Sequence, residues 1–454
     1  MKHLVIYIRK IASLLHHPLA AQACVAIAAL LAFSPTFGNL LMTGWDDQWQ
    51  VTNHYTSGGW TWANLYAIFT EAHGMQYSPL NQCFYTLLYM ADGYNPAVFH
   101  AACLLVHIAN CCLVYRLLRR LMADTLHLPS AMEARTAFFA TLLFAIHPLQ
   151  VETVAWVSAS KILLCTFFYL LATGLFVRYL RHGQRMAYAG AMLLFTCAYG
   201  SKEQALVFPV WATLLCLFYG HRLRSPFVWK SVMPFYLVSL FFGLVFVLDI
   251  KSATGFSLSA LSAKSAQSEV AVWEYTWMQR VVFCCYSLVE YFTKWIAPFN
   301  LLYLYPFPMS PGEALPVWLL VYPMILGACV YALWSSFRQR VVAGGTAFFV
   351  AHLLPVLHII PIGRAAIVAD RYIYLSSVGL AFIAVYYLDV LFHRLRPRAK
   401  CCFCGVALLL LFGMATYTYR RTTVWHDTAS IRQKILELTG YSSKVDVKQQ
   451  KELP

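Results

Sequence analysis

Two adjacent carboxylates, Asp46 and Asp47, are the residues of this sequence best suited to acid–base chemistry. They lie between Trp45 and Trp49, shortly after a long apolar segment. Because two ionised carboxylates side by side repel each other, the pKa of one is expected to rise, and such a group can act as a general base. The alternative is a pair of solvated carboxylates beside Trp side chains that anchor a membrane interface.

Further ionisable residues occur beside other apolar segments. They are His147, Glu152, Lys161, Lys202, Glu203, Asp370 and Arg371. A charged group at mid-bilayer costs about 2.5 to 3.5 kcal/mol, so charges that persist near hydrocarbon usually pair or serve a site. We predict that these residues gather around one cavity, where three cations beside an acidic loop would suit a membrane-borne phosphate.

Local explanations stay open for these groups. His147 can cap the helix that ends at Pro148, and Glu152 can pair with Lys161. The neighbouring opposite charges at 202–203 and at 370–371 can be simple ion pairs. The histidine and glutamate do not fit the zinc motif H-E-x-x-H, and the 14 cysteines show no repeated C-x-x-C at zinc spacing. We therefore expect the cysteines to pack in the core, and a metal requirement is left unknown.

Apolar helices must position these side chains. Apolar residues make up 60% of the chain and charged residues 12%, with a mean hydropathy of +0.60, which leaves too little polar surface for a soluble globule. We predict an all-α polytopic membrane protein with about eleven transmembrane helices, some of them shorter than the ~20 residues of a full span. The predicted spans are 20–41, 96–118, 134–150, 160–178, 186–200, 204–219, 230–249, 316–334, 341–361, 372–391 and 401–418.

The basic residues predict the orientation of the spans. They gather in alternate loops, and only Asp124, Glu133 and Asp389 are acidic on that side, so the positive-inside rule makes it cytoplasmic. The net charge of +15 is then a topology signal, and nucleic-acid binding is not expected. The N-terminus is placed in the cytoplasm and the C-terminus outside. The clusters are Lys2/Arg9/Lys10, Arg116/Arg119/Arg120/Arg135, Arg178/Arg181/Arg185, Arg222/Arg224/Lys230, Arg338/Arg340 and Arg394/Arg396/Arg398/Lys400.

The predicted organisation is one transmembrane domain, 1–418, and a short outer tail, 419–454. The first outer loop, 42–95, carries the acidic pair, and a second long outer loop covers 250–315. The start of the chain is polar and lacks a convincing cleavage site after the first apolar run, so no signal peptide is expected.

The segment 277–298 in the second long loop has a polar stripe of Arg280, Glu290 and Lys294. This pattern predicts an amphipathic helix on the outer surface of the membrane. The alternative is a twelfth span, which would reverse the orientation of everything after it.

A series of short motifs resembles the membrane part of the TMTC-type protein O-mannosyltransferases and their bacterial relatives, over nearly the whole chain. The motifs are Trp45-Asp46-Asp47, Thr61-Trp62, Phe69-Thr70, Ser78-Pro79-Leu80-Asn81, Gly93-Tyr94-Asn95-Pro96, His100, His107, the segment 147–158, Lys161, Ser201-Lys202-Glu203 and the segment 370–375.

This resemblance implies a GT-C glycosyltransferase fold and transfer of a mannose-like sugar, with inversion, from a polyprenyl-phosphate carrier to a hydroxyl acceptor. The acceptor would be Ser or Thr of a protein, or a cell-surface glycan. The resemblance makes Asp46 and Asp47 the catalytic carboxylates, and it assigns Lys161, Lys202 and Arg371 to the carrier phosphate. No other cofactor is implied with certainty.

The sequence departs from the family at two places. Many relatives have an acidic residue where this chain has Ile162, and they commonly carry tetratricopeptide repeats after the last span, for which the tail is too short. Acceptors would then be selected differently. No Asn-x-Ser/Thr sequon occurs, which favours a bacterial inner membrane with an outward-facing site over the endoplasmic reticulum. The competing hypotheses are a lipid-linked precursor flippase and an inactive scaffold of the same fold.

Overall fold

The computed structural model describes residues 17–71, 76–254, 275–359 and 366–439. Every named secondary-structure element in these ranges is a helix, and one isolated β-bridge joins Tyr305 to Val368. The all-α prediction is confirmed.

Six helices in the described ranges are long and apolar enough to cross a membrane. Two of them extend through a 3-10 turn at one end: α2 through Gly38, and α10 from Val157. Helix α8 (Ser130–Ile146) makes a seventh with α9 (Val151–Ala155), to which it is joined through Pro148 at a bend of 52°. A polytopic membrane protein is therefore confirmed. The six are α2 (Pro18–Phe33), α7 (Pro96–Thr125), α10 (Ser160–His182), α13 (Pro226–Thr254), α18 (Ser377–Arg394) and α19 (Pro397–Val424).

Four shorter helices occupy the remaining predicted ranges, so a helix lies in each of the eleven. Whether all four cross the membrane stays a prediction. The start of the span predicted at 372 is wrong: Asp370–Ile373 form the 3-10 helix η9, and α18 begins only at Ser377. The four are α11 (Arg185–Ser201), α12 (Phe208–Phe218), α16 (Val321–Leu333) and α17 (Arg340–Leu353).

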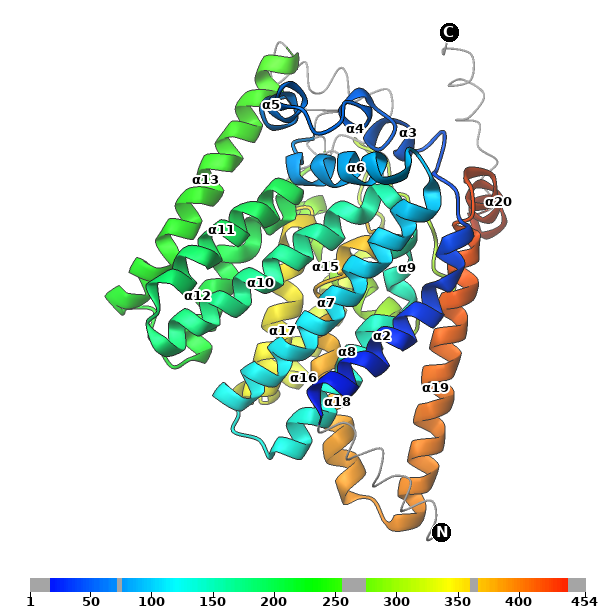
Figure 1. The fold of residues 1–454 in the computed structure, drawn as a ribbon. Coiled ribbons are helices and arrows are strands. Elements are labelled where there is room, and N and C mark those ends of the chain that lie inside the picture. Colours follow the sequence, from blue (N-terminus) through cyan, green and yellow to red (C-terminus); the bar gives the residue numbers. More distant parts are fainter. Residues whose placement is uncertain (1–16, 72–75, 255–274, 360–365, 440–454) are drawn as a thin grey trace.

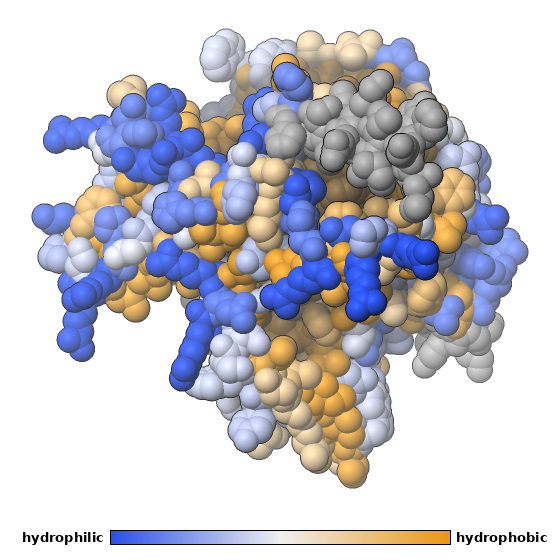
Figure 2. Space-filling view, turned by 90° about the horizontal axis from the view of Figure 1, so that it is seen from below, coloured by the Kyte–Doolittle hydropathy of each residue, from blue (hydrophilic) through white to orange (hydrophobic). Residues whose placement is uncertain are grey.

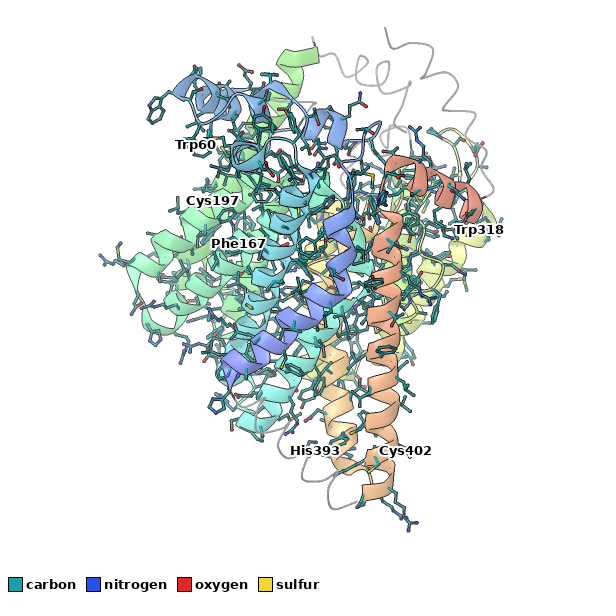
Figure 3. The ribbon with its side chains drawn as sticks, turned by 45° about the vertical axis from the view of Figure 1, so that its right-hand side comes forward. Trp60, Phe167, Cys197, Trp318, His393 and Cys402 are labelled. Atoms are coloured by element: carbon teal, nitrogen blue, oxygen red, sulfur yellow. The ribbon has the colours of Figure 1, made fainter. Side chains whose placement is uncertain are left out.

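The predicted first outer loop folds into a layer of short helices across one end of the bundle, at the top of Figure 1. Helix α2 begins near the opposite end, and α20 (Thr428–Thr439) lies beside the layer. Trp60 lies at the end with the layer, whereas His393 and Cys402 lie at the other (Figure 3). The acidic loop and the start of the tail thus share one end, as the predicted topology requires. The layer consists of α3 (Asp47–Gln50), α4 (His54–Ser57), α5 (Trp62–Thr70) and α6 (Pro79–Asp92).

Helix α15 (Trp277–Ile296) is amphipathic, as predicted. Val282, Phe283 and Tyr291 are buried on one face, whereas the polar stripe contains an ion pair of 2.9 Å between Glu290 and Lys294. A capping box at its start satisfies backbone N–H groups that a helix end otherwise leaves without partners. Residues 255–274 of the same predicted loop lie outside the described residues.

Candidate active site

Asp46 and Asp47 begin α3 in different surroundings. Asp47 is buried, and its Oδ1 accepts hydrogen bonds from the backbone N–H of Ser158, at 2.9 Å, and from the Ser158 hydroxyl. Its Oδ2 accepts from the backbone N–H of Met42 at 2.9 Å. Asp46 is half-buried, and the Nε2 of Gln50 lies 3.5 Å from its Oδ2. Asp47 therefore ties the loop to the 157–159 segment, and Asp46 presents the more accessible carboxylate.

Burial raises the pKa of Asp47 from its ordinary value of 3.8 to about 6, against three hydrogen bonds that lower it. The charge of Asp46 is the smallest of the contributions. The expectation that one pKa of the pair rises is met, but the main cause is loss of water around Asp47 rather than repulsion by its neighbour.

The raised pKa of Asp47 predicts a pH-dependent stability. A carboxyl group whose pKa is higher in the folded state contributes stability that is complete below pH 3.8 and is lost as the pH rises through about 6. A pKa shift of this size changes the free energy of unfolding by about 2 to 3 kcal/mol at most. The melting temperature of the wild type should therefore fall between pH 4 and pH 7 relative to that of Asp47→Asn. A constant difference in melting temperature across this range would contradict the burial argument.

Lys161 occupies the first turn of α10 and points its ammonium group into the layer of short helices. Its Nζ donates to the Oε1 of Gln50 at 3.0 Å and to the Oε1 of Gln76 at 2.7 Å. The charges of Lys202, Glu203, Asp46 and Arg371 all act on Lys161. Five of the predicted site residues thus converge, although they come from four distant parts of the chain.

Arg371 is held by Glu152, which the alternative reading had paired with Lys161. The Glu152 carboxylate accepts from the Arg371 guanidinium and, at 2.8 Å, from the Arg371 backbone N–H. The guanidinium lies over the ring of Trp156, with its Cζ 5.4 Å from the ring centroid, and over that of Tyr372 at 4.8 Å. Its side chain is still 26% exposed, so it can meet a ligand.

The other predicted residues have local or structural partners. Lys202 is buried and forms an ion pair of 3.1 Å with Glu203, whose side chain is half exposed. His147 is buried. Its Nδ1 accepts a hydrogen bond from the backbone N–H of Leu149 at 3.2 Å, and its Nε2 lies 3.0 Å from the carbonyl oxygen of Trp295. The His147 side chain therefore caps the start of the 3-10 helix η2 (Pro148–Gln150) that follows α8, rather than the end of α8 itself, and it links this turn to the end of α15.

Asp370 is not paired with its neighbour Arg371, contrary to the local-pair alternative. Its Oδ2 lies 2.6 Å from Nη2 of Arg421 on α19, and its Oδ1 accepts from the Tyr305 hydroxyl at 2.9 Å. Both charged side chains are almost fully buried. The pair joins α19 to η9, which positions Arg371 one residue further on. Arg421 falls in the predicted outer tail, 419–454, although α19 continues to Val424.

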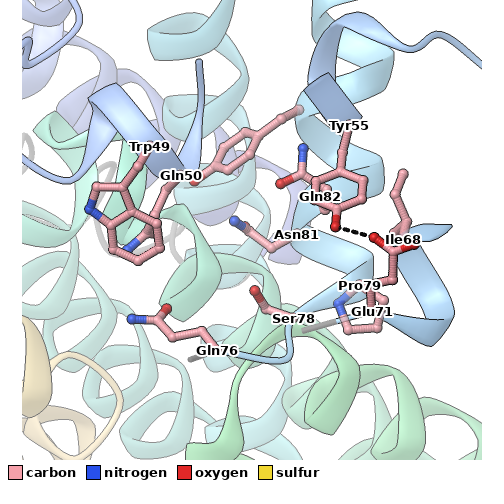
Figure 4. A pocket seen from close by; sticks show the side chains of 11 residues that line it. Trp49, Gln50, Tyr55, Ile68, Glu71, Gln76, Ser78, Pro79, Asn81 and Gln82 are labelled. Carbon is pink, nitrogen blue, oxygen red and sulfur yellow. Dashed lines mark hydrogen bonds between the residues drawn. The ribbon is translucent and has the colours of Figure 1, made fainter. Parts of the chain in front are cut away.

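A polar pocket opens within the layer of short helices, beside Lys161 (Figure 4). It encloses about 410 Å³, including its open mouth. Amide, hydroxyl and aromatic groups line it, and the Tyr55 hydroxyl donates to the Glu71 carboxylate at 2.5 Å. The motif at 78–81 was the one sequence signal for this pocket, because neutral amides give no charge pattern. Its polar and aromatic lining is Trp49, Gln50, Tyr55, Glu71, Gln76, Ser78, Asn81, Gln82 and Tyr85.

Three tryptophans from distant parts of the chain pack against one another beside the acidic pair. The rings of Trp45, Trp156 and Trp425 lie 5.8 to 6.2 Å apart, two of the three pairs stacked. Trp425 follows the last apolar helix, so the start of the tail packs directly against the acidic loop. No group of three His, Cys, Asp or Glu side chains able to hold a metal ion occurs among the described residues.

The fold and this site define the class: an all-helical polytopic membrane protein with a charged site at one end of its bundle. No family model and no curated protein matches the sequence. Among solved structures, the chain is similar to ArnT from Cupriavidus metallidurans, determined with undecaprenyl phosphate bound. The two chains are 14% identical, the match covers 95% of this chain and 80% of that one, and the TM-score is 0.41.

Proposed function

We propose that this chain is a GT-C glycosyltransferase that transfers a sugar from a polyprenyl-phosphate carrier to a hydroxyl group. The observation that carries the proposal is the convergence of an accessible carboxylate, Asp46, with Lys161, Lys202 and Arg371 at the end of a membrane bundle. A carrier with a long apolar chain must be met at the membrane, and its phosphate needs cations. By the resemblance of its motifs, the sugar is mannose-like and the acceptor is Ser or Thr of a protein.

The proposed reaction is a single displacement. Asp46 takes the proton of the acceptor hydroxyl while the oxygen of that hydroxyl attacks the anomeric carbon of the sugar. The bond from that carbon to the phosphate oxygen breaks, and the polyprenyl phosphate leaves as an anion. The guanidinium of Arg371 and the ammonium of Lys202 stabilise the charge that develops on it. Attack from the face opposite the leaving group inverts the anomeric centre.

The polar pocket is the proposed place of the sugar ring. Amide and carboxylate groups hydrogen-bond to sugar hydroxyls, and an aromatic ring such as Trp49 offers an apolar face to the sugar. Gln50 and Gln76, which line this pocket, both accept hydrogen bonds from Lys161, so in this proposal Lys161 lies between the pocket and the phosphate site. The proposed site faces the outside of a bacterial inner membrane.

Sugar transfer by the purified protein tests this function. The wild type is incubated with polyprenyl-phosphate mannose or polyprenyl-phosphate glucose and with Ser/Thr-rich peptides, and products are identified by mass spectrometry. Transfer from either donor supports the proposal. Carrier movement across vesicles without transfer would replace it with the flippase hypothesis, and failure to bind the carrier would favour an inactive scaffold.

A substitution in the pocket separates sugar recognition from carrier binding. Glu71→Gln removes a charged acceptor that can bond to a sugar hydroxyl, so affinity for polyprenyl-phosphate mannose should fall about tenfold. Affinity for the bare polyprenyl phosphate should not change. Asp92→Asn, an exposed change at the end of α6, is the matched control. Equal affinities of wild type and Glu71→Gln for the sugar-bearing carrier would place the sugar elsewhere.

A further inference from the structure

A second pocket lies between helices α7, α10, α12, α17 and α18, separate from the polar one. It encloses about 720 Å³, including its open mouth. Its lining is almost entirely apolar, and its largest share comes from the C-terminal half of α7. An apolar lining of this kind suits a hydrocarbon chain.

Close helix packing forms the walls of this pocket. Gly345 of α17 and Gly379 of α18 touch through their backbones, because a Cβ atom at Gly379 would lie 2.3 Å from the Gly345 carbonyl oxygen. Trp211 packs edge to face on Phe348, with ring centroids 4.8 Å apart. These contacts involve backbone and large rings, so the pocket is a built feature of the bundle rather than a gap between mobile side chains.

Among the described residues that line the apolar pocket, Arg340 alone is charged. Its Nη1 donates to the carbonyl oxygen of Thr125 at 2.9 Å, which fixes the guanidinium at the end of α7. The side chain is otherwise exposed. The acidic neighbour Asp124 is already engaged by Arg120, Arg181 and the Tyr219 hydroxyl, so it leaves the positive charge of Arg340 available.

The pocket opens at the end of the bundle opposite to the acidic loop. Arg340 belongs to one of the basic clusters that predict the cytoplasmic side, and Figure 2 shows hydrophilic side chains around apolar surface on the face seen from this end. An apolar pocket between helices with a basic group at its mouth has the chemistry that selects anionic lipids of the cytoplasmic leaflet.

We propose that this pocket binds one anionic phospholipid, with an acyl chain between α7 and α17 and the phosphate at Arg340. A neutral or zwitterionic lipid could place the same chain there but would gain less from the guanidinium. None of the residues of the proposed transfer site lines this pocket. Lipid binding here can therefore be tested independently of sugar transfer.

Native mass spectrometry of the delipidated protein with phosphatidylglycerol or phosphatidylcholine tests this site. The wild type should retain phosphatidylglycerol about fivefold more than phosphatidylcholine. Arg340→Gln should abolish this preference, and Leu121→Trp, which fills part of the pocket, should weaken retention of both lipids. Arg338→Gln removes an exposed charge of the same loop that does not line the pocket, and should retain the preference.

Three results would overturn the proposal: no preference in the wild type, a preference kept in Arg340→Gln, or an equal loss in Arg338→Gln. Displacement of the phospholipid by polyprenyl phosphate in an Arg340-dependent way would also overturn it, because the pocket would then belong to the carrier. Thermal unfolding of each variant in detergent shows whether the bundle is intact.

Discussion

Asp46→Asn should lower the rate of sugar transfer by about 10² to 10⁴, the usual contribution of a positioned general base. The asparagine keeps the size and the hydrogen bond to Gln50 but cannot take the proton of the acceptor hydroxyl. Affinity for the carrier should change little, because the phosphate is held by cations elsewhere. The measurement is kcat and KM for peptide glycosylation at saturating polyprenyl-phosphate mannose, with carrier binding followed in parallel.

The neighbouring carboxylate, Asp47, should respond differently to the same substitution. Asp47 accepts three hydrogen bonds from Ser158 and Met42, so Asp47→Asn should mainly alter stability and its pH dependence. Asp92→Asn controls for the loss of one negative charge at the same end. A folded Asp47→Asn variant that loses transfer while Asp46→Asn keeps it would move the base to Asp47. Full activity of the double variant would remove both residues from the mechanism.

The helices could be predicted from the sequence because each depends on a local run of apolar residues. All eleven predicted ranges contain a helix, and α15 shows the predicted division into a buried and a polar face. The start of α18 was missed since backbone and side chain of Arg371 both bind Glu152, which holds residues 370–373 in a tight turn. That contact joins positions 219 residues apart, and no local pattern encodes it.

The sequence predicted that the charged residues lie at one end of the bundle, but it did not predict their partners. Adjacent opposite charges suggested an Asp370–Arg371 pair, but the two side chains point to different partners, and Asp370 meets Arg421 from the last long helix. Likewise, the raised pKa of Asp47 follows from burial, which depends on how the loop folds over Ser158. The sequence alone thus indicates which charged groups need a partner, whereas the packing of the helices determines which residue that partner is.

Arg371→Gln should weaken binding of bare polyprenyl phosphate by about 10-fold to 100-fold, which corresponds to a charge-assisted hydrogen bond of about 1.5 to 3 kcal/mol. The guanidinium is oriented by Glu152 and by the ring of Trp156, yet remains partly exposed. Arg371→Lys keeps the charge but not the planar fork, so it should recover only part of the affinity. Titration of the purified protein with polyprenyl phosphate measures these effects.

The arginine also balances a buried carboxylate, so loss of binding must be separated from loss of the fold. Arg371→Gln leaves Glu152 without its ion-pair partner, which is strongly destabilising for a buried charge. The double variant Glu152→Gln/Arg371→Gln removes both charges and should recover thermal stability without recovering phosphate affinity. Arg420→Gln, an exposed change near the end of α19, should leave both properties unchanged. Recovery of affinity in the double variant would show that Arg371 only neutralises Glu152, and the phosphate would then belong to Lys202.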